Sequence, residues 1–238
     1  TKQAKPKRLL SLFLALTMVL CLLPALGTTA LAASGSGTEG DPYVVTDYDE
    51  LRELLRSKTE SDPTCYIKLG GDITDSSSRN NHKLSIHDGA DIVLDLAGHS
   101  LTRSGSTTDY CLFAVCGASL TVNDSVGGGG ITARTVAGGP YLTGAAIWVQ
   151  NWSKSRLTVN GGTFAGGEYG IVTEGGTTVI NGGTILSLNP EINSFVQSIA
   201  GYFRIGTVIV NGGTFGDSTS AGDAIDIRDA ADVTLNNC

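Results

Sequence analysis

A short apolar alternation followed by Asn-Gly-Gly-Thr occurs three times in this chain and constrains its fold more than any other feature. The stretches are SRLTVNGGTF at 155–164, TTVINGGTI at 177–185 and TVIVNGGTF at 207–215. Alternation with a period of two is typical of β-strands, because successive strand side chains point to opposite faces. Asn and Gly accept left-handed backbone angles at low cost, and the β-branched Thr then starts a new strand. Each motif is therefore interpreted as a strand, a corner and a second strand.

The same alternation ends at six places along the chain, which indicates an internal repeat. It ends at residues 95, 123, 160, 181, 211 and 236, with spacings of 28, 37, 21, 30 and 25 residues, and CYIKLGGDIT at 65–74 looks like an earlier copy. Spacings of this size fit the coils of a strand solenoid, in which no single coil can bury its apolar face alone. A β-sandwich would also show short strands, but it has no reason to repeat one corner at one offset. We predict an all-β solenoid of about seven coils with roughly three strands each.

Within each copy, residues two apart share a face, so the pattern predicts which side chains point inward. Phe164, Ile185 and Phe215 follow the corner at one offset and form a second inward column. A third column would contain Ile147, Ile171 and Ile225. The first column is predicted to contain Ile92/Leu94, Leu120/Val122, Leu157/Val159, Thr178/Ile180, Val208/Val210 and Val233/Leu235.

Over residues 64–238 this pattern resembles the right-handed parallel β-helix of the pectin-lyase-like superfamily. DLAGHSLT at 95–102 resembles an early coil of exported β-helix proteins, and the NGGTF form resembles repeat regions of adhesin-like Gram-positive surface proteins. The resemblance implies a stacked ladder of corner asparagines, here Asn123, Asn160, Asn181, Asn211 and Asn236. It is specific for the fold and says little about the activity.

One helix is predicted in the part of the chain that precedes the strands. Asp47 and Glu50 have the spacing of a capping box, and Leu51, Leu54 and Leu55 form one apolar stripe. The helix is expected from Tyr48 to about residue 57, where it resembles the cap that shields the N-terminal end of a β-helix. The predicted organisation is a signal peptide at 1–32, a linker at 33–41, an N-terminal cap with the helix at 42–63, and a parallel β-helix at 64–238.

The first 32 residues have the composition of a secretory signal. A basic head precedes an apolar run of about 15 residues at Leu9–Leu23, and Ala30 and Ala32 occupy the small-residue positions of a cleavage site after Ala32. The alternative is a retained membrane anchor, for which the run is short. We expect a secreted or cell-surface protein of a Gram-positive-type bacterium, which meets a membrane only through this signal during export.

The charge of the remaining chain narrows the range of partners. Without residues 1–32, which hold four basic residues and no acidic one, 12 basic residues stand against 23 acidic ones, a net charge near −11. Nucleic-acid binders show the opposite sign, so no nucleic-acid partner is expected. The expected partner is a polysaccharide or a host or cell-surface glycan.

The cysteines and histidines predict no metal site. Cys111 and Cys116 have odd spacing, which puts them on opposite faces of a strand and favours the interpretation as small buried side chains. His82, His87 and His99 form no catalytic or zinc motif and are expected to be structural or solvated. No cofactor is expected, and calcium is kept as the alternative, since paired carboxylates hold it in a lyase.

The strongest candidate for ligand chemistry is the charged stretch at 221–238. In it Ile225 and Ile227 are expected to face inward and Asp226 outward, and an outward Arg204 in the preceding coil would stack on Asp226. An outward row shared with Trp148 would hold a sugar chain. The candidate ligand-binding residues are Trp148, Arg204, Asp226, Arg228 and Asp229.

The same stretch resembles the region of polygalacturonases in which a strand aspartate is catalytic. Asp223 and Asp226 match that pattern, while Ala224 replaces a glycine of the family. If the chain is an enzyme, Asp223, Asp226 and Arg204 would act in a polysaccharide hydrolase or lyase. The plainer interpretation is that the stretch is an ordinary coil. The sequence therefore favours a non-catalytic β-helix module that is adhesive or binds polysaccharide, with the degrading enzyme as the alternative.

Overall fold

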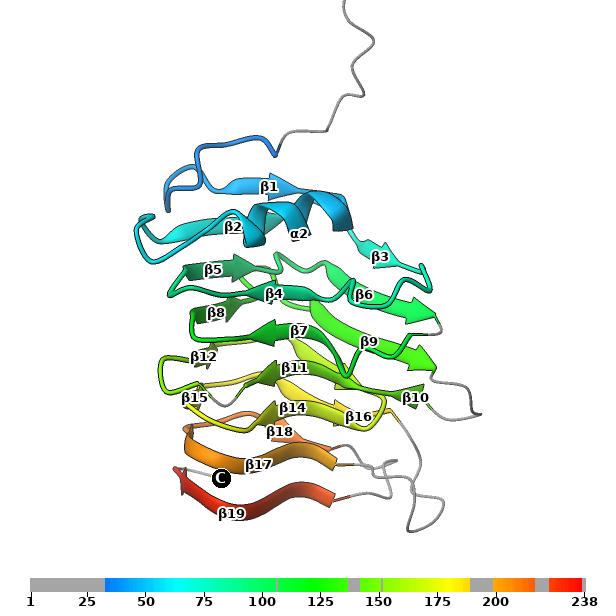
Figure 1. The fold of residues 1–238 in the computed structure, drawn as a ribbon, viewed down its shortest axis with the longest axis vertical. Helices are drawn as coiled ribbons and strands as arrows, with labels where there is room; N and C mark the ends of the chain where they lie inside the picture. Colours follow the sequence, from blue (N-terminus) through cyan, green and yellow to red (C-terminus); the bar gives the residue numbers. More distant parts are fainter. Residues whose placement is uncertain are drawn as a thin grey trace, which may run out of the picture. The chain divides into compact units, whose positions relative to one another are not determined.

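The computed structural model of the protein describes residues 33–105, 107–136, 142–150, 152–188, 199–216 and 223–236, and all statements below concern these. Residues 33–238 fold as one unit, a parallel β-solenoid of about six turns with one short helix (Figure 1). Residues 1–32, which contain the expected signal peptide and its cleavage site, lie outside the described residues. No helix in the described part is both long and apolar enough to cross a bilayer.

The first face of the solenoid contains the strand that precedes each corner. Neighbouring strands are parallel and hydrogen-bonded from one turn to the next. The strands are β1 (Tyr43–Val45), β2 (Cys65–Leu69), β5 (Asp91–Asp95), β8 (Ser119–Asn123), β12 (Arg156–Val159), β15 (Thr177–Ile180), and the second halves of β17 (Ile199–Val210) and β19 (Asp223–Leu235).

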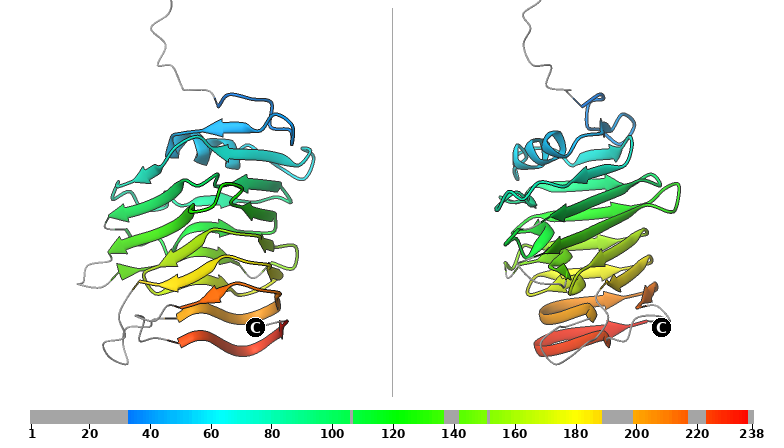
Figure 2. Two further views of the ribbon diagram at one scale, coloured as in Figure 1. Left: turned by 180° about the vertical axis from the view of Figure 1, so that it is seen from behind. Right: turned by 90° about the vertical axis from the view of Figure 1, so that its right-hand side faces the viewer.

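The second face contains the strands that follow the corners, and Figure 2 shows the stack from behind and from the side. Its strands are β3 (Ile73–Asp75), β6 (Ser100–Gly105), β9 (Gly130–Val136), β13 (Thr163–Gly166), β16 (Thr184–Ser187) and β18 (Thr214–Phe215). The short β10 (Leu142–Thr143) pairs with β9 in the antiparallel direction.

The third face closes each turn. Its strands are β4 (Leu84–Ile86), β7 (Cys111–Val115), β11 (Ala145–Val149), β14 (Tyr169–Thr173), and the first halves of β17 and β19. In β17 and β19 the chain runs from the third face into the first without a break, which joins the two faces into one 12-stranded sheet.

The structure has about six turns where the repeat count predicts about seven. Six turns start at β2, β5, β8, β12, β15 and the second half of β17, and each continues across all three faces. The seventh repeat copy, around Val233 and Leu235, is the second half of β19. This copy supplies a first-face strand only. The number of repeat copies therefore exceeds the number of complete turns by one.

The predicted inward columns are confirmed by the strand register. Ile92, Leu120, Leu157, Thr178, Val208 and Val233 pair in that order through six successive strands of the first face. Phe164, Ile185 and Phe215 pair in the same way on the second face. Most of these side chains lie in one continuous apolar core, which is the arrangement that lets coils stabilise one another.

The Asn-Gly-Gly corners divide two tasks between their residues. The asparagine side chains hydrogen-bond from turn to turn at 2.8 Å, from Asn236 through Asn211, Asn181 and Asn160 to Asn123. The second glycine, not the asparagine, takes the left-handed backbone angle, as in Gly183 with φ of 96°. A Cβ at Gly183 would lie 2.7 Å from the carbonyl oxygen of the glycine one turn earlier, so only glycine fits there.

The predicted helix is α2 (Tyr48–Arg56), and it begins where the capping pattern places it. The Asp47 carboxylate accepts the backbone N–H of Glu50 at 3.0 Å. Leu51 and Leu55 are fully buried in the main core, and α2 packs against β4 and β3. The helix therefore covers the free edge of the third face, while β1 covers the first face. Residues 34–40, expected as a linker, hydrogen-bond back to this cap, with Val44 N donating to Ser34 O at 2.8 Å.

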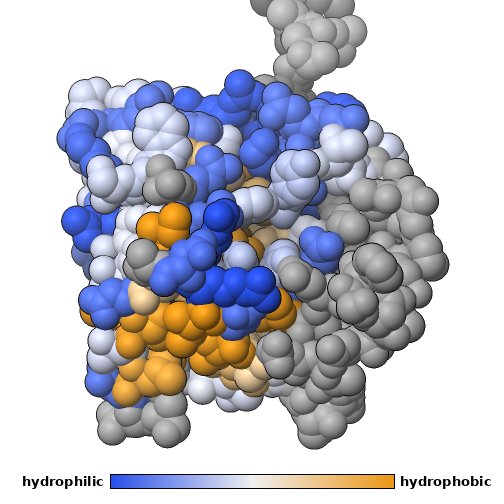
Figure 3. All heavy atoms as spheres, turned by 60° about the horizontal axis from the view of Figure 1, so that its bottom comes forward, coloured by the Kyte–Doolittle hydropathy of each residue, from blue (hydrophilic) through white to orange (hydrophobic). Residues whose placement is uncertain are grey.

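In the middle of the stack, each turn covers apolar side chains of the turn before it. The corresponding side chains of β19, the last described strand, are exposed. Ile227 is 50% exposed and Leu235 is 49% exposed. Figure 3 brings this end of the stack forward and shows apolar residues gathered there. The inner turns bury the corresponding side chains almost completely.

Candidate functional site

The outward side of the third face carries most of the residues that the sequence selects as ligand-binding. Strand register places Trp148 beside Val172, Val172 beside Tyr202, and Tyr202 beside Asp226. Because the strands are parallel and in register, these outward side chains form one row along the stack.

The expected stacking of Arg204 on Asp226 is wrong. Tyr202 is the residue that pairs with Asp226, two positions before Arg204. The cause is Gly201, which occupies the inward position that Ile225 fills in the next turn. A Cβ at Gly201 would lie 2.9 Å from both Phe203 and Phe215 rings, so the crowded core requires glycine there. A glycine carries no apolar side chain, and the alternation alone therefore aligns the wrong residues.

Arg204 links two other turns of the same face. Its Nε donates to Asp229 Oδ2 at 2.7 Å, and its Nη1 lies 3.4 Å from Glu174 Oε1. The hydrogen bond to Asp229 raises the pKa of Arg204 above its ordinary value. The register shifts between Phe203 and Ile205, where Arg204 lies, and such a bulge re-aims a side chain. Arg204 is therefore held at the surface by carboxylates above and below it.

Asp226 is held by Arg228 of its own strand. Its Oδ2 accepts hydrogen bonds from Arg228 Nε at 2.8 Å and lies 2.7 Å from Arg228 Nη2, and this contact raises the pKa of the arginine. The Arg228 guanidinium also lies 5.8 Å from the centre of the Tyr202 ring. Asp223 begins β19 and pairs with Ile199, but its side chain lies outside the described part of the structure.

Aromatic rings from neighbouring turns complete this surface, which we call the aromatic face: Tyr110, Trp148, Tyr169, Tyr202, and the charged Glu174, Arg204, Asp226, Arg228 and Asp229. The indole Nε1 of Trp148 donates to Glu174 Oε2 at 3.1 Å, and Tyr110 meets the indole edge-on at 5.9 Å. The ring centres of Tyr169 and Tyr202 lie 5.2 Å apart. The sequence selects Trp148 but misses the three tyrosines and Glu174. Of these, Tyr202 is aligned with Trp148 and Asp226 in the observed register.

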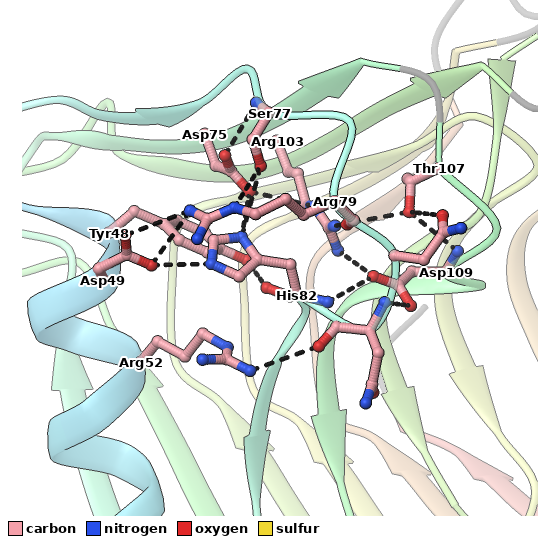
Figure 4. A network of polar contacts seen from close by, with 12 residues as sticks. Tyr48, Asp49, Arg52, Asp75, Ser77, Arg79, His82, Arg103, Thr107 and Asp109 are labelled. Atoms are coloured by element: carbon pink, nitrogen blue, oxygen red, sulfur yellow. Dashed lines mark hydrogen bonds and ion pairs between the residues drawn. The ribbon is translucent and has the colours of Figure 1, made fainter.

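A second cluster of charged side chains is buried beneath α2, where His82 joins three elements (Figure 4). His82 Nδ1 lies 2.9 Å from Asp75 Oδ2, and its Nε2 lies 2.7 Å from Asp49 Oδ1. The Tyr48 hydroxyl donates to the His82 carbonyl oxygen at 3.0 Å, and burial raises the pKa of this tyrosine. His82 is thus a structural residue that fixes the helix to the first turn.

Arg103 is the cation of this buried cluster, and its side chain is fully buried. Its Nη1 donates to Asp109 Oδ2 at 2.6 Å, and its Nε lies 3.3 Å from Asp75 Oδ2. Burial alone would raise the pKa of Asp109, but hydrogen bonds from Arg103 and from the backbone of His82 hold it below its ordinary value. A buried cation with two carboxylates satisfies the requirement that buried charges be paired.

The remaining histidines and the cysteines supply no assembled chemical site. His99 Nδ1 lies 3.7 Å from Asp72, and His87 lies at the surface between α2 and the third face. Cys65, Cys111 and Cys116 are free and buried, and burial raises the pKa of Cys111 to about 12. In the ranges that the structure describes, no three His, Cys, Asp or Glu side chains are grouped as a metal site. Cys238 lies outside those ranges.

The aromatic face offers groups that suit a ligand rich in hydroxyl groups, but its carboxylates are poorly arranged for proton transfer. Flat rings offer apolar surface, and arginines and carboxylates offer hydrogen bonds to hydroxyl groups. Asp226 and Asp229 each already accept from an arginine. Comparison of the chain with known protein families, with curated proteins and with solved structures finds no match.

Proposed function

We propose that this protein is a non-catalytic β-solenoid module, exported to the cell surface of a Gram-positive-type bacterium, that binds polysaccharide. The observation that supports this function is the aromatic face. Its rings come from successive turns, and arginine–carboxylate pairs lie beside them. Bacterial, host or other cell-surface glycans are the proposed partners.

The geometry of the stack suits a long, repetitive ligand. Neighbouring turns lie about 4.8 Å apart, so a chain that runs along the axis meets the side chains of one turn after another at regular intervals. The side chains of the face are held in place by their own contacts, as in the Trp148–Glu174–Arg204–Asp229 series. Side chains that are ordered before binding lose less entropy when a ligand arrives.

The finer resemblance to the pectin-lyase-like superfamily supports an alternative, a polygalacturonase-like hydrolase or a pectate-lyase-like enzyme. That alternative requires a carboxylate free to transfer a proton or to hold calcium. The arginine contacts of Asp226 and Asp229 favour binding over catalysis, because they commit both carboxylates to holding the surface together.

A glycan array tests the binding function. We expect wild-type protein to bind a subset of polysaccharides and the Trp148→Ala and Tyr202→Ala variants to bind them about tenfold more weakly, because a stacking surface is lost. Tyr66→Ala is the matched control, since Tyr66 lies on the first face and should leave binding unchanged. Equal binding by all four proteins, or no binding by wild type, would refute the proposal.

A degradation assay tests the alternative. The protein is incubated with polygalacturonate, with and without calcium, and new reducing or unsaturated ends are measured. We expect none above background. Release that disappears in the Asp226→Ala variant would establish the enzyme instead.

A further inference from the structure

A groove lies beside α2, and its lining includes Cys116 and Gln150, which follow the third-face strands β7 and β11. Its volume is about 530 Å³, and a second hollow of about 480 Å³ adjoins it, sharing His87, Asp88 and Cys116. Both volumes fall in the range of ligand-binding clefts. The first hollow is lined by Arg52, Arg56, Lys58, Asn81, Lys83, Ser85, His87, Asp88, Cys116 and Gln150, and the second adds Glu60, Gly89, Gly117, Trp152, Ser153 and Lys154.

The charge of the first hollow is opposite to that of the chain. Four basic side chains line it against the single carboxylate of Asp88. These four are a third of the 12 basic residues in 33–238, a stretch with 23 acidic residues. A concave surface of one sign concentrates the field of its charges and attracts ligands of the opposite sign.

Several of these cations are available to a ligand. In the described residues, Arg56, Lys58 and Lys83 make no ion pair with a carboxylate. Lys58 lies over the Tyr43 ring, 5.3 Å from its centre, and Lys83 donates to the Asn81 side chain at 3.4 Å. Arg52 differs from them, because it is ion-paired with Glu53 and donates to the Asn81 carbonyl oxygen. Arg56 and Lys83 are therefore the side chains best placed to receive anionic groups.

The walls of the groove are fixed by contacts already present. His82 of the buried cluster lies between Asn81 and Lys83 in the chain, and Figure 4 shows Arg52 directed at the same segment. In the second hollow, Glu60 N donates to Asp88 O at 2.7 Å and joins two of its lining residues. Cys116 Sγ donates to Gln150 Oε1 at 3.1 Å on the third-face side. The groove is preformed, which lowers the entropic cost of binding.

The second hollow adds an aromatic side chain to this basic surface. Trp152 is 60% exposed, and its ring lies over Gly117, where a Cβ would be 3.7 Å from it. Lys154 and Glu60 form an ion pair at 3.2 Å at the same place. A sugar ring suits an exposed indole that has hydrogen-bonding groups beside it.

We propose that this groove binds an acidic glycan, a sugar chain that bears carboxylate, sulfate or phosphate groups. Its anionic groups lie against Arg56 and Lys83, and one sugar ring lies against Trp152. The acidic remainder of the surface repels a longer polyanion such as nucleic acid, so recognition is confined to a short segment. The groove is a second site, and its function does not depend on that of the aromatic face.

Calorimetry with the whole chain tests the groove. The probes are a chondroitin sulfate oligosaccharide, a polygalacturonate oligosaccharide, a phosphorylated oligosaccharide, a neutral dextran oligosaccharide, inorganic sulfate and an oligoglutamate peptide. We expect at least one acidic oligosaccharide to bind, more weakly as salt rises, and the neutral one not to bind this groove. The acidic probe that binds best identifies the anionic group.

Paired variants locate the site. We expect Arg56→Gln combined with Lys83→Gln to weaken binding about tenfold, through the loss of two charge contacts. Lys68→Gln combined with Arg156→Gln removes the same charge from the first face and should change affinity less than about twofold. Trp152→Ala should weaken binding of the acidic oligosaccharide but not binding of the oligoglutamate peptide. The Trp148→Ala variant should keep its affinity for the acidic oligosaccharide that this groove binds, although it binds polysaccharides of the aromatic face more weakly, and this difference separates the two sites.

Three outcomes would overturn the proposal. The first is that none of the acidic oligosaccharides binds. The second is that both double variants lose affinity equally, which would indicate a general charge effect. The third is that oligoglutamate or inorganic sulfate binds as tightly as the best glycan and Trp152→Ala has no effect, which would assign the groove to acidic peptides or to free anions.

Discussion

At the residue scale, the buried cluster around Arg103 shows how a charged group is accommodated in a small apolar core. Arg103 has carboxylates of Asp75 and Asp109 beside it and donates to the Arg79 carbonyl at 2.8 Å. Removing one member of such a buried set costs about 3–5 kcal/mol, because its partner remains buried without compensation. The cluster is therefore a specific structural requirement of the first turns.

This cluster makes stability depend on acidity. The pKa values of Asp75 and Asp109 are lower in the folded chain than the ordinary carboxyl value near 4. The folded state thus binds fewer protons than the unfolded state as the pH falls, so the contribution is complete above the ordinary value and is lost below it. We expect urea midpoints to stay level from about pH 7 to 5 and to fall below about pH 4.

The Asp109→Asn variant checks the cause of that acid sensitivity. We expect it to be about 3 kcal/mol less stable than wild type at neutral pH and to lose less additional stability on acidification. Asp232→Asn, at an exposed position of β19, is the matched control and should follow the wild-type curve. A parallel shift of the Asp109→Asn curve, with unchanged acid sensitivity, would contradict the assignment.

Residue-scale contacts between turns could not be read from the sequence. Asp109 lies 27 residues after His82, and Tyr48 lies 34 residues before it. Such contacts are one turn apart, and the spacing of the turns varies from 21 to 37 residues. The corner asparagines and the inward columns could be matched, because they belong to strands whose alternation sets the register.

At the element scale, the asparagine ladder joins the corners of successive turns by hydrogen bonds that the strand ladders do not supply. Asn181 donates to Asn160 and accepts from Asn211, whereas Asn123 has a single described neighbour in the ladder, Asn160. An intramolecular hydrogen bond contributes about 1 kcal/mol net. The inner positions should therefore matter more than the first.

The ladder gives a graded prediction. We expect Asn181→Ala to lower the free energy of unfolding by about 2 kcal/mol and Asn123→Ala by about 1 kcal/mol, since two and one ladder bonds are lost. Chemical denaturation with matched slopes measures both. Equal effects at the two positions would show that the ladder bonds do not contribute in this way.

Alternation predicted the strands of the first and second faces and the inward side of each, because the core selects apolar side chains at every second position. On the third face it also predicted β11, β14 and the first half of β19, but it failed at β4 and in β17 for identifiable reasons. β4 has three residues, too few to show a period, and it lies between the polar His82 and His87. In β17 a glycine at an inward position and a bulge at Arg204 interrupt the pattern. The aromatic face lies there, so its residues were only partly predicted.

At the scale of the whole molecule, the two ends of the stack are treated differently. The N-terminal end is covered by β1 and α2, and Leu51 and Leu55 of α2 join the main core. At the other end, Ile227 and Leu235 are half exposed on β19, the last strand that the structure describes. A strand edge beside exposed apolar side chains is a site of association between chains.

We therefore expect the 238-residue chain to self-associate through the β19 end. Replacing Ile227 and Leu235 by lysine should shift the distribution toward monomer, as measured by light scattering across a concentration series. Val126→Lys is the matched control, because Val126 is an exposed apolar residue elsewhere on the surface. Association that persists in the double variant, or that the control also abolishes, would place the contact elsewhere.

The hydrogen bonds between successive turns, including those of the asparagine ladder, point along the axis of the stack. Force applied along that axis would therefore break the hydrogen bonds of one turn at a time, and the solenoid would unfold turn by turn rather than all at once. Each turn of 21 to 37 residues would release roughly 70–130 Å of extended chain. A module built in this way is expected to lengthen in steps under load while its remaining turns stay folded.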